Sequence, residues 1–157
     1  MHILVVYHSK TGNTEKMALA IAEGAREAGV DVVVKKAKET ANDDLLKADG
    51  IIVGSPTYYG QMAAEVKAVF DGSVKIHGKL EGKVGAAFTS SGGTACGAET
   101  TILSILGAML VHGMIVQGRA EIQHYGSAAV GEPKKQDEEK CKRSGKRVAD
   151  LVLKLKR

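Results

Sequence analysis

The stretch His8-Ser9-Lys10-Thr11-Gly12-Asn13-Thr14 decides the fold, because it joins two segments with different hydrophobic patterns. Before it runs the apolar segment Ile3–Tyr7, and after it the amphipathic segment Met17–Ala22. The order is strand, hydroxyl-rich loop and helix, which places backbone N–H groups and a helix N-terminus at the carboxyl end of a strand. The stretch is therefore predicted to cradle a phosphate. Taken alone, it is also compatible with a capped turn that binds nothing.

The side chains of this loop suit an anion. Ser9, Thr11 and Thr14 bring hydroxyl donors. Gly12 allows close approach of the backbone, and Asn13 tolerates the left-handed conformation of a tight turn.

Length and composition limit the possibilities further. A chain of 157 residues indicates one domain, and 44% hydrophobic with 25% charged residues is typical of a globular protein with a real core. The net charge of +4 is mild, and no aromatic ladder accompanies the basic residues. A nucleic-acid surface is therefore not expected.

The cysteines and the apolar segments predict a cytoplasmic protein. Cys96 and Cys141 lack metal-like spacing and indicate a reducing compartment. The N-terminus enters a strand directly, so no signal peptide is expected. The apolar region Ile102–Val116 is too short and too interrupted to span a bilayer, so no membrane insertion is expected.

Strand-like and helix-like segments alternate five times, which predicts a doubly wound α/β fold with a parallel sheet and one domain over residues 1–157. In the helix expected over Ala98–His112, we predict four residues to face inward, and in the last helix another four form the buried stripe. A loop is expected over His124–Pro133. The expected strands are His2–Tyr7, Val30–Lys35, Gly50–Gly54, Val84–Thr89 and Met114–Val116, the last with a candidate resumption near Ala120–Ile122. The expected inward residues are Ile102, Leu103, Leu106 and Leu110 in the first helix and Val148, Leu151, Val152 and Leu155 in the second.

Three loops predicted at the carboxyl edge of the sheet are rich in Gly, Ser, Thr and Tyr: residues 8–14, 55–60 and 90–97. The connections at the opposite edge are plainer. This asymmetry predicts a planar ligand with a phosphate tail, whose phosphate is held by the first loop and whose ring is held by the other two.

Other α/β functions lack their residues. A phosphoacceptor domain needs carboxylates where His8 and Ser9 stand, and no loop carries the Gly-Lys-Ser/Thr or Gly-x-Gly-x-x-Gly pattern. No arginine closely follows Cys96, which excludes a cysteine phosphatase, and no Gly-x-Ser-x-Gly elbow occurs. The five histidines show no metal spacing, so no metal site is expected.

The three loops together resemble a known family. Ser9–Thr14 resembles the phosphate loop of flavodoxins, whose pattern is Ser/Thr-x-Thr-Gly-x-Thr. Ser55–Met62 and Ser90–Glu99 resemble the flavin loops of flavodoxin-like proteins and of the Trp-repressor-binding-protein type of quinone reductase. His112-Gly113-Met114 matches that reductase branch, where the histidine lies near the flavin. The resemblance implies a flavodoxin-like three-layer sandwich, a five-stranded parallel sheet of order 2-1-3-4-5, and bound FMN.

The resemblance also implies which residues bind the cofactor. For His112 a helix-terminal role is equally compatible, and it is a catalytic candidate only in a reductase. Cys96 is expected to be a small packed residue rather than a redox thiol, and Cys141 to be core. The implied cofactor-binding residues are Ser9, Lys10, Thr11, Gly12, Asn13, Thr14, Pro56, Thr57, Tyr58, Tyr59, Gly60, Ser90, Ser91, Gly92, Gly93, Thr94, Ala95, Cys96, Gly97 and His112.

Three functions follow, in order of preference. The first is an electron carrier that passes electrons between redox partner proteins. The second is an NAD(P)H:quinone oxidoreductase, and the third a non-redox binding module. The net charge of this chain is positive, whereas carrier flavodoxins are usually acidic. The segment Gly72–Gly82 lacks the aromatic residue that the reductase branch has there. Whether the protein is a monomer or a homo-oligomer stays open.

Overall fold

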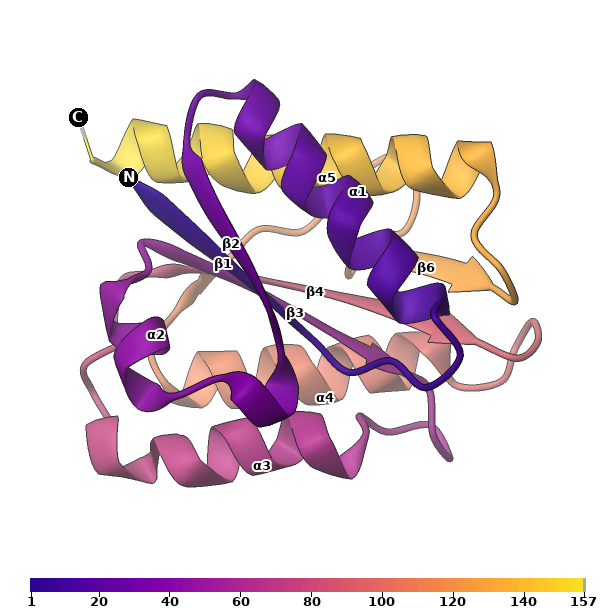
Figure 1. Cartoon of the computed structure of the whole chain (residues 1–157), viewed down its shortest axis with the longest axis horizontal. Helices are drawn as coiled ribbons and strands as arrows, with labels where there is room; N and C mark the ends of the chain where they lie inside the picture. The colour runs from indigo at the N-terminus through magenta and orange to yellow at the C-terminus, as the bar shows by residue number, and fades with distance from the viewer. Residues whose placement is uncertain (157) are drawn as a thin grey trace.

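A parallel β-sheet forms the middle layer of the computed structural model, which describes residues 1–156 (Figure 1). Its strands lie in the order β2-β1-β3-β4-β5, as the family resemblance implies. All neighbouring pairs are parallel. The strands are β1 (His2–Tyr7), β2 (Asp31–Lys36), β3 (Gly50–Pro56), β4 (Val84–Ser91) and β5 (Ile115–Val116).

A sixth strand, β6 (Ser127–Val130), was not predicted, and it replaces part of the loop expected over His124–Pro133. It pairs with Phe88–Ser91, whereas β5 pairs with Val84 and Gly85, so both lie along the same side of β4. The prediction that the last strand resumes near Ala120–Ile122 is therefore wrong. The sequence Ser-Ala-Ala-Val carries little of the β-branched signal of a strand, and its pairing depends on a tertiary contact instead.

Helices cover both faces of the sheet (Figure 1). On one face lie α1 (Asn13–Glu27) and α5 (Lys135–Leu155). On the other lie α3 (Ala64–Gly72), α4 (Ala98–Val111) and the short α2 (Asn42–Lys47), with single-turn helices at Ala37–Glu39 and Ser73–Ile76. The predicted boundaries hold to within one residue for α4 and β2.

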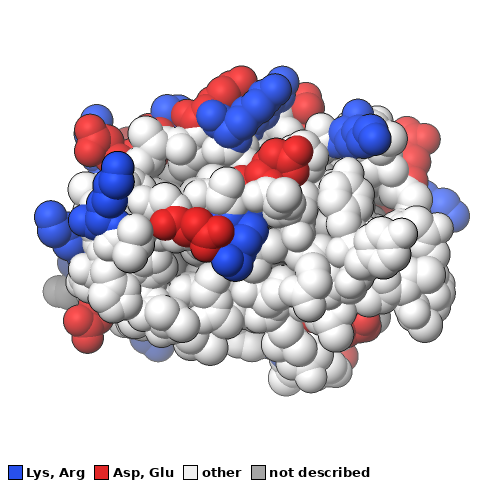
Figure 2. Space-filling view, turned by 90° about the horizontal axis from the view of Figure 1, so that it is seen from below, with Lys and Arg blue, Asp and Glu red and all other residues white. Residues whose placement is uncertain are grey.

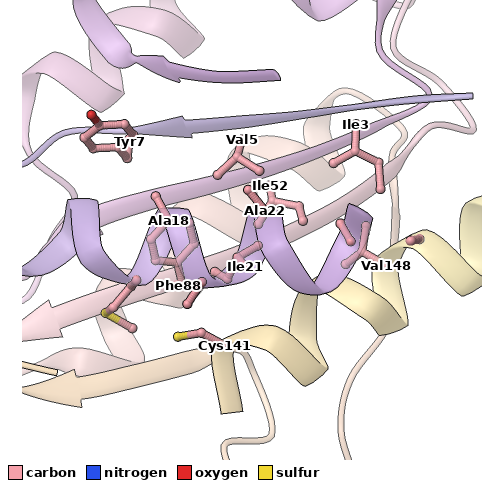
Figure 3. Packing of buried hydrophobic residues seen from close by; sticks show 14 of the residues in the cluster. Ile3, Val5, Tyr7, Ala18, Ile21, Ala22, Ile52, Phe88, Cys141 and Val148 are labelled. Atoms are coloured by element: carbon pink, nitrogen blue, oxygen red, sulfur yellow. The ribbon is translucent and has the colours of Figure 1, made fainter. Parts of the chain in front are cut away.

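The core is divided by the sheet into two clusters, and β1 contributes to both. Ile3, Val5 and Tyr7 face α1 and α5, whereas Leu4 and Val6 face the opposite layer. A strand buried on both faces needs an unbroken apolar run rather than an alternating one. Figure 3 shows the first cluster, in which Phe88 lies among side chains of the sheet, α1 and α5.

Helices α1 and α5 cross so closely that glycine is required where they meet. A Cβ on Gly24 would collide with the backbone of Lys142, and one on Gly145 with the backbone of Ile21. Cys141 is buried beside this crossing, which confirms its predicted place in the core, and burial raises the pKa of its thiol to about 12.

Helix α4 is rotated relative to the sequence prediction. Of the four predicted inward residues, Leu103 and Leu110 are instead 44% and 60% exposed. Because this helix is apolar on every side, its periodicity could not select the buried face. In α5, Leu155 is half exposed rather than buried. The residues of α4 that do pack inward are Thr101, Ile102, Ile105, Leu106 and Met109.

Candidate functional site

A cleft of about 250 Å³ lies at the carboxyl edge of the sheet, where the three predicted loops meet. All but one of the residues that line it belong to the loops predicted from the sequence. The lining residues are Ser9, Lys10, Thr11, Asn13, Thr14, Pro56, Thr57, Tyr58, Ser90, Ser91, Gly92 and Gly131.

The first loop ends in an uncapped helix N-terminus. Gly12 stands at the cap position with φ +97°, and no side chain of residues 1–156 caps the helix. The Gly12 N–H donates to Ser9 Oγ at 3.1 Å, which fixes the turn. The N–H groups of Asn13, Thr14 and Glu15 have no intrahelical acceptor, as in the first turn of any helix. This end of α1 therefore offers an anion several backbone donors and the positive end of the helix dipole.

Thr14 ties the first loop to the third. Its hydroxyl is buried and lies 2.8 Å from Ser90 Oγ near the end of β4. Strand β4 extends through Ser91, so Ser90 and Ser91 belong to the sheet rather than to the loop that follows it. A hydrogen bond between two buried hydroxyls holds the two walls of the cleft at a fixed separation.

The second loop is hydrogen-bonded to β4 through its backbone and side chain. The Thr57 N–H donates to the Ser90 carbonyl at 2.7 Å. Thr89 Oγ1 donates to the Ser55 carbonyl at 2.7 Å and lies 2.8 Å from Thr57 Oγ1. Because a hydroxyl has one proton, Thr57 must be the donor in the second of these bonds. Thr57 is thus held in one orientation at the wall of the cleft.

Beyond Thr57 the chain makes a two-residue hairpin turn. Tyr58 and Gln61 exchange two backbone hydrogen bonds of 3.0 Å. The central residues Tyr59 and Gly60 have φ of +50° and +72°, which is the geometry of a type I′ turn. Tyr58 lines the cleft, and the centroid of its ring lies 6.4 Å from that of the His8 ring in an edge-on arrangement. Tyr59, by contrast, is fully exposed to solvent.

The third loop starts α4 and contacts the second. Gly97 stands at the helix cap with φ +97°, and a Cβ there would lie 2.6 Å from Gly60 Cα. Ser91 Oγ donates to the Gly93 carbonyl at 3.0 Å. Of this loop only Gly92 lines the cleft beside Ser90 and Ser91. Cys96 is exposed, which contradicts the prediction of a packed residue, because the loop projects beyond the sheet edge.

Gly131 is the lining residue that the sequence reasoning missed. Its N–H donates to the Ser91 carbonyl at 2.8 Å directly after β6. The segment is also connected to α1 by ion pairs of Lys16 with Glu132 and Glu138, at 3.5 and 3.2 Å. Recognising β6 would have placed Gly131 at the same edge as the three loops, but its small residues gave no clear strand signal.

His112 does not join the three loops within the chain. It follows α4, whereas Gly97 precedes this helix, and 14 helical residues separate the two by about 20 Å. His112 is buried, with Nε2 2.7 Å from Ser73 Oγ. Since Ser73 Oγ donates to the Phe70 carbonyl, Nε2 carries the proton, and Nδ1 has no hydrogen-bond partner within residues 1–156. Burial, and secondarily His77, lower its pKa.

Over residues 1–156, none of the helices combines the length and apolar character needed to cross a membrane.

Comparison with known proteins gives consistent results. The family described as Flavodoxin matches residues 5–145. A protein of Archaeoglobus fulgidus named NAD(P)H dehydrogenase (quinone) is 38% identical, covering 98% of each chain. A flavodoxin of Aquifex aeolicus is 40% identical, over 96% of this chain and 86% of its own. Among solved structures, a WrbA-like flavodoxin from Agrobacterium tumefaciens superposes with a TM-score of 0.83, 30% identity and 98% coverage of both chains.

Proposed function

The chain belongs to the flavodoxin family, and from this premise we propose that it is an FMN-dependent electron carrier whose cofactor occupies the cleft between loops 8–14, 56–60 and 90–92. Proteins of this family bind FMN. The chemistry of the cleft fits that cofactor. One end is lined by hydrogen-bond donors that can hold an anion, and the other end is lined by a tyrosine and small residues.

The phosphate of FMN is assigned to the uncapped N-terminus of α1. Ser9, Thr11 and Asn13 supply polar side chains around backbone N–H groups that have no intrahelical acceptor. Lys10 lies at the same end and adds positive charge. Thr14 positions the first loop against β4, since its hydroxyl is already hydrogen-bonded to that of Ser90.

The flavin ring is assigned to the part of the cleft between the second and third loops. Tyr58 borders it on one side, and Ser91 and Gly92 border it on the other. Thr57 Oγ1 donates its proton to Thr89, so its lone pairs stay free to accept a hydrogen bond from the ring without further ordering. When bound, the flavin supplies the one- and two-electron chemistry, and these residues orient it and limit access of water.

One observation carries the preference for a carrier: Tyr59 and residues 94–96, which follow the loop residues at the ring end of the cleft, are exposed to solvent. The segment after α3 folds as a single-turn helix, Ser73–Ile76, near the distant end of α4. Within residues 1–156, no residue of this segment lines the cleft, whose ring end is bordered by Tyr58, Ser91 and Gly92. An uncovered ring edge suits electron transfer to a protein partner. We propose redox proteins of the cytoplasm as partners, which agrees with the two free cysteines.

A second candidate is an NAD(P)H:quinone oxidoreductase. It is favoured by the relative from Archaeoglobus fulgidus, which has that kind of name and matches along the whole chain. In this case an open ring face would admit nicotinamide and then quinone. His112 could act only if another chain brought it near the cleft, because its own helix holds it at the opposite edge.

The deciding experiment mixes the FMN-loaded protein anaerobically with NADH or NADPH and follows flavin absorbance. A carrier is expected to keep its oxidised spectrum with both nucleotides and to reduce with dithionite in two separable one-electron steps. Fast bleaching with turnover on a benzoquinone would contradict the carrier and establish the reductase. A protein that does not take up FMN would overturn both proposals.

A further inference from the structure

Two carboxylates lie beside the end of the cleft that is assigned to the phosphate. Glu132 directly follows Gly131, which lines the cleft, and Glu138 stands in the first turn of α5. Both are directed toward α1, because Lys16 Nζ lies 3.5 Å from Glu132 Oε1 and 3.2 Å from Glu138 Oε1. Like charges repel each other, so these carboxylates oppose the binding of a phosphate unless a cation offsets them.

Lys16 is the cation of this cluster, and it belongs to the helix that begins at the cleft. It lies one turn after the cap residue, and its backbone N–H donates to the Gly12 carbonyl at 3.0 Å. Among residues 1–156, Lys10 is the one Lys or Arg that lines the cleft. The hydrogen bond of Lys16 with Glu138 is the main cause that raises its pKa above 10.5, so its ammonium group is charged at neutral pH. Lys16 therefore acts on an anion in the cleft through the two carboxylates.

Charged groups are unevenly distributed over the molecule. Figure 2, which looks onto the side of α3 and α4, shows a broad area without charged side chains. On the opposite side of the sheet, a second ion pair connects α1 with α5 away from the cleft. Lys142 Nζ lies 2.7 Å from Glu23 Oε1, and Glu23 is about 16 Å along α1 from Gly12. This second pair offers a matched comparison, because it makes the same kind of link without facing the cleft.

We infer that Lys16 is a positioning residue for the phosphate, and that it gives the cleft part of its preference for FMN over riboflavin, which has the same ring without the phosphate. Lys16 compensates one of the two negative charges and holds both carboxylates at its own ammonium group. Without Lys16, both charges act on the phosphate uncompensated. The inference rests on the proposed FMN site and adds a residue that sets its selectivity.

A purely structural role of Lys16 would have a different consequence. Its ion pairs also connect α1 with the segment after β6, in which the Gly131 N–H donates to the Ser91 carbonyl at 2.8 Å. If Lys16 only held this segment in place, its loss would weaken the binding of FMN and riboflavin equally, because both have the ring and the ribityl chain. Repulsion by the carboxylates acts on the phosphate alone. The ratio of the two affinities therefore separates the two roles.

The test titrates the flavin-free protein with FMN and with riboflavin and follows the quenching of flavin fluorescence. At low ionic strength, Lys16→Met is expected to bind FMN about threefold more weakly than the wild-type protein and riboflavin with the same affinity. The difference for FMN should fade near 1 M salt, where the Debye length is about 3 Å. Lys142→Met is the matched control and should bind both flavins as the wild-type protein does. Urea unfolding checks that each variant is folded.

Neutralising the carboxylates tests the same charges in the opposite direction. The double variant Glu132→Gln, Glu138→Gln is expected to bind FMN more tightly than the wild-type protein. Adding both changes to Lys16→Met should restore at least the wild-type preference for FMN over riboflavin. An unchanged ratio of the two affinities in Lys16→Met would overturn the inference and leave the FMN site intact, as would a triple variant that still binds FMN weakly. A wild-type protein that binds neither flavin would overturn the proposed function together with the inference.

Discussion

Gly60 and Gly97 lie back to back where the second and third loops meet, with a Cβ on Gly97 only 2.6 Å from Gly60 Cα. Gly97 also begins α4 at φ +97°. One glycine thus meets two demands at once, a left-handed helix cap and contact with a neighbouring backbone. The second and third loops approach this closely because neither residue has a side chain.

Gly97→Ala is expected to weaken FMN binding at least tenfold, about 1.4 kcal/mol, because the added methyl group pushes the second loop away. Gly82→Ala is the matched control, since Gly82 is also left-handed but has open space around it. Both variants should lose about 1–2 kcal/mol of unfolding free energy through backbone strain. Fluorescence titration with FMN separates them, and equal affinity for the two variants would refute the contact.

Thr14→Val is expected to lower the unfolding free energy by about 1–3 kcal/mol, because it leaves the buried Ser90 hydroxyl without its partner. Adding Ser90→Ala to Thr14→Val should cost less than Ser90→Ala alone. Urea unfolding of both single variants and the double variant measures this coupling. Fully additive losses would mean that the bond does not hold the two loops together.

Tyr59→Asn is expected to raise the unfolding free energy by about 0.5–1 kcal/mol, because asparagine tolerates the left-handed conformation of this turn and tyrosine does not. Thermal unfolding of the protein without FMN measures the gain. We expect FMN affinity to change little, since Tyr58 rather than Tyr59 lines the cleft. A large loss of affinity would show that Tyr59 folds onto the bound ring.

The two cysteines are expected to differ sharply in reactivity. Cys96 is exposed, whereas Cys141 is buried and its thiol pKa is raised to about 12. A thiol-specific chromogenic reagent at neutral pH should titrate one thiol in the native protein and both after unfolding in guanidinium. Fast reaction of two thiols in the native state would contradict the packing around Cys141.

His112 is expected to make the protein less stable as the pH falls. Burial and His77 hold its folded-state pKa below the ordinary 6.5 of the unfolded chain. Between these two pKa values the unfolded state binds a proton that the folded state does not, so stability rises with pH across that interval. The dependence cannot exceed about 1.4 kcal/mol per pH unit and ends above the unfolded pKa.

The variant His112→Gln isolates this effect, because its amide N–H can replace the Nε2 donor to Ser73 without titrating. Unfolding in urea between neutral and mildly acidic pH should show a shallower dependence for His112→Gln than for the wild-type protein. His124→Gln is the control, since His124 is exposed. Identical profiles for all three proteins would contradict a buried neutral His112.

Local chemistry in the sequence predicted a parallel sheet and most of the cleft, whereas the order of the strands was implied by the resemblance to flavodoxins. An unbroken apolar run such as Ile3–Tyr7 identifies a strand buried on both faces. A hydroxyl-rich loop between strand and helix, as at Ser9–Thr14, carries its function in adjacent residues. In a parallel sheet all such loops meet at one edge, so eleven of the twelve lining residues could be assigned before any coordinates.

Only the tertiary structure decided the features that depend on non-local contact. Strand β6, and with it Gly131, exists because a small-residue segment pairs with β4, and no local propensity records that pairing. The buried side of α4 was settled by the sheet, since a helix apolar all round has no periodicity to read. His112 was placed at the opposite edge from the cleft by the length of that same helix. Local sequence thus determined which elements form and which loops carry the chemistry, whereas packing between distant segments determined which surfaces stay exposed.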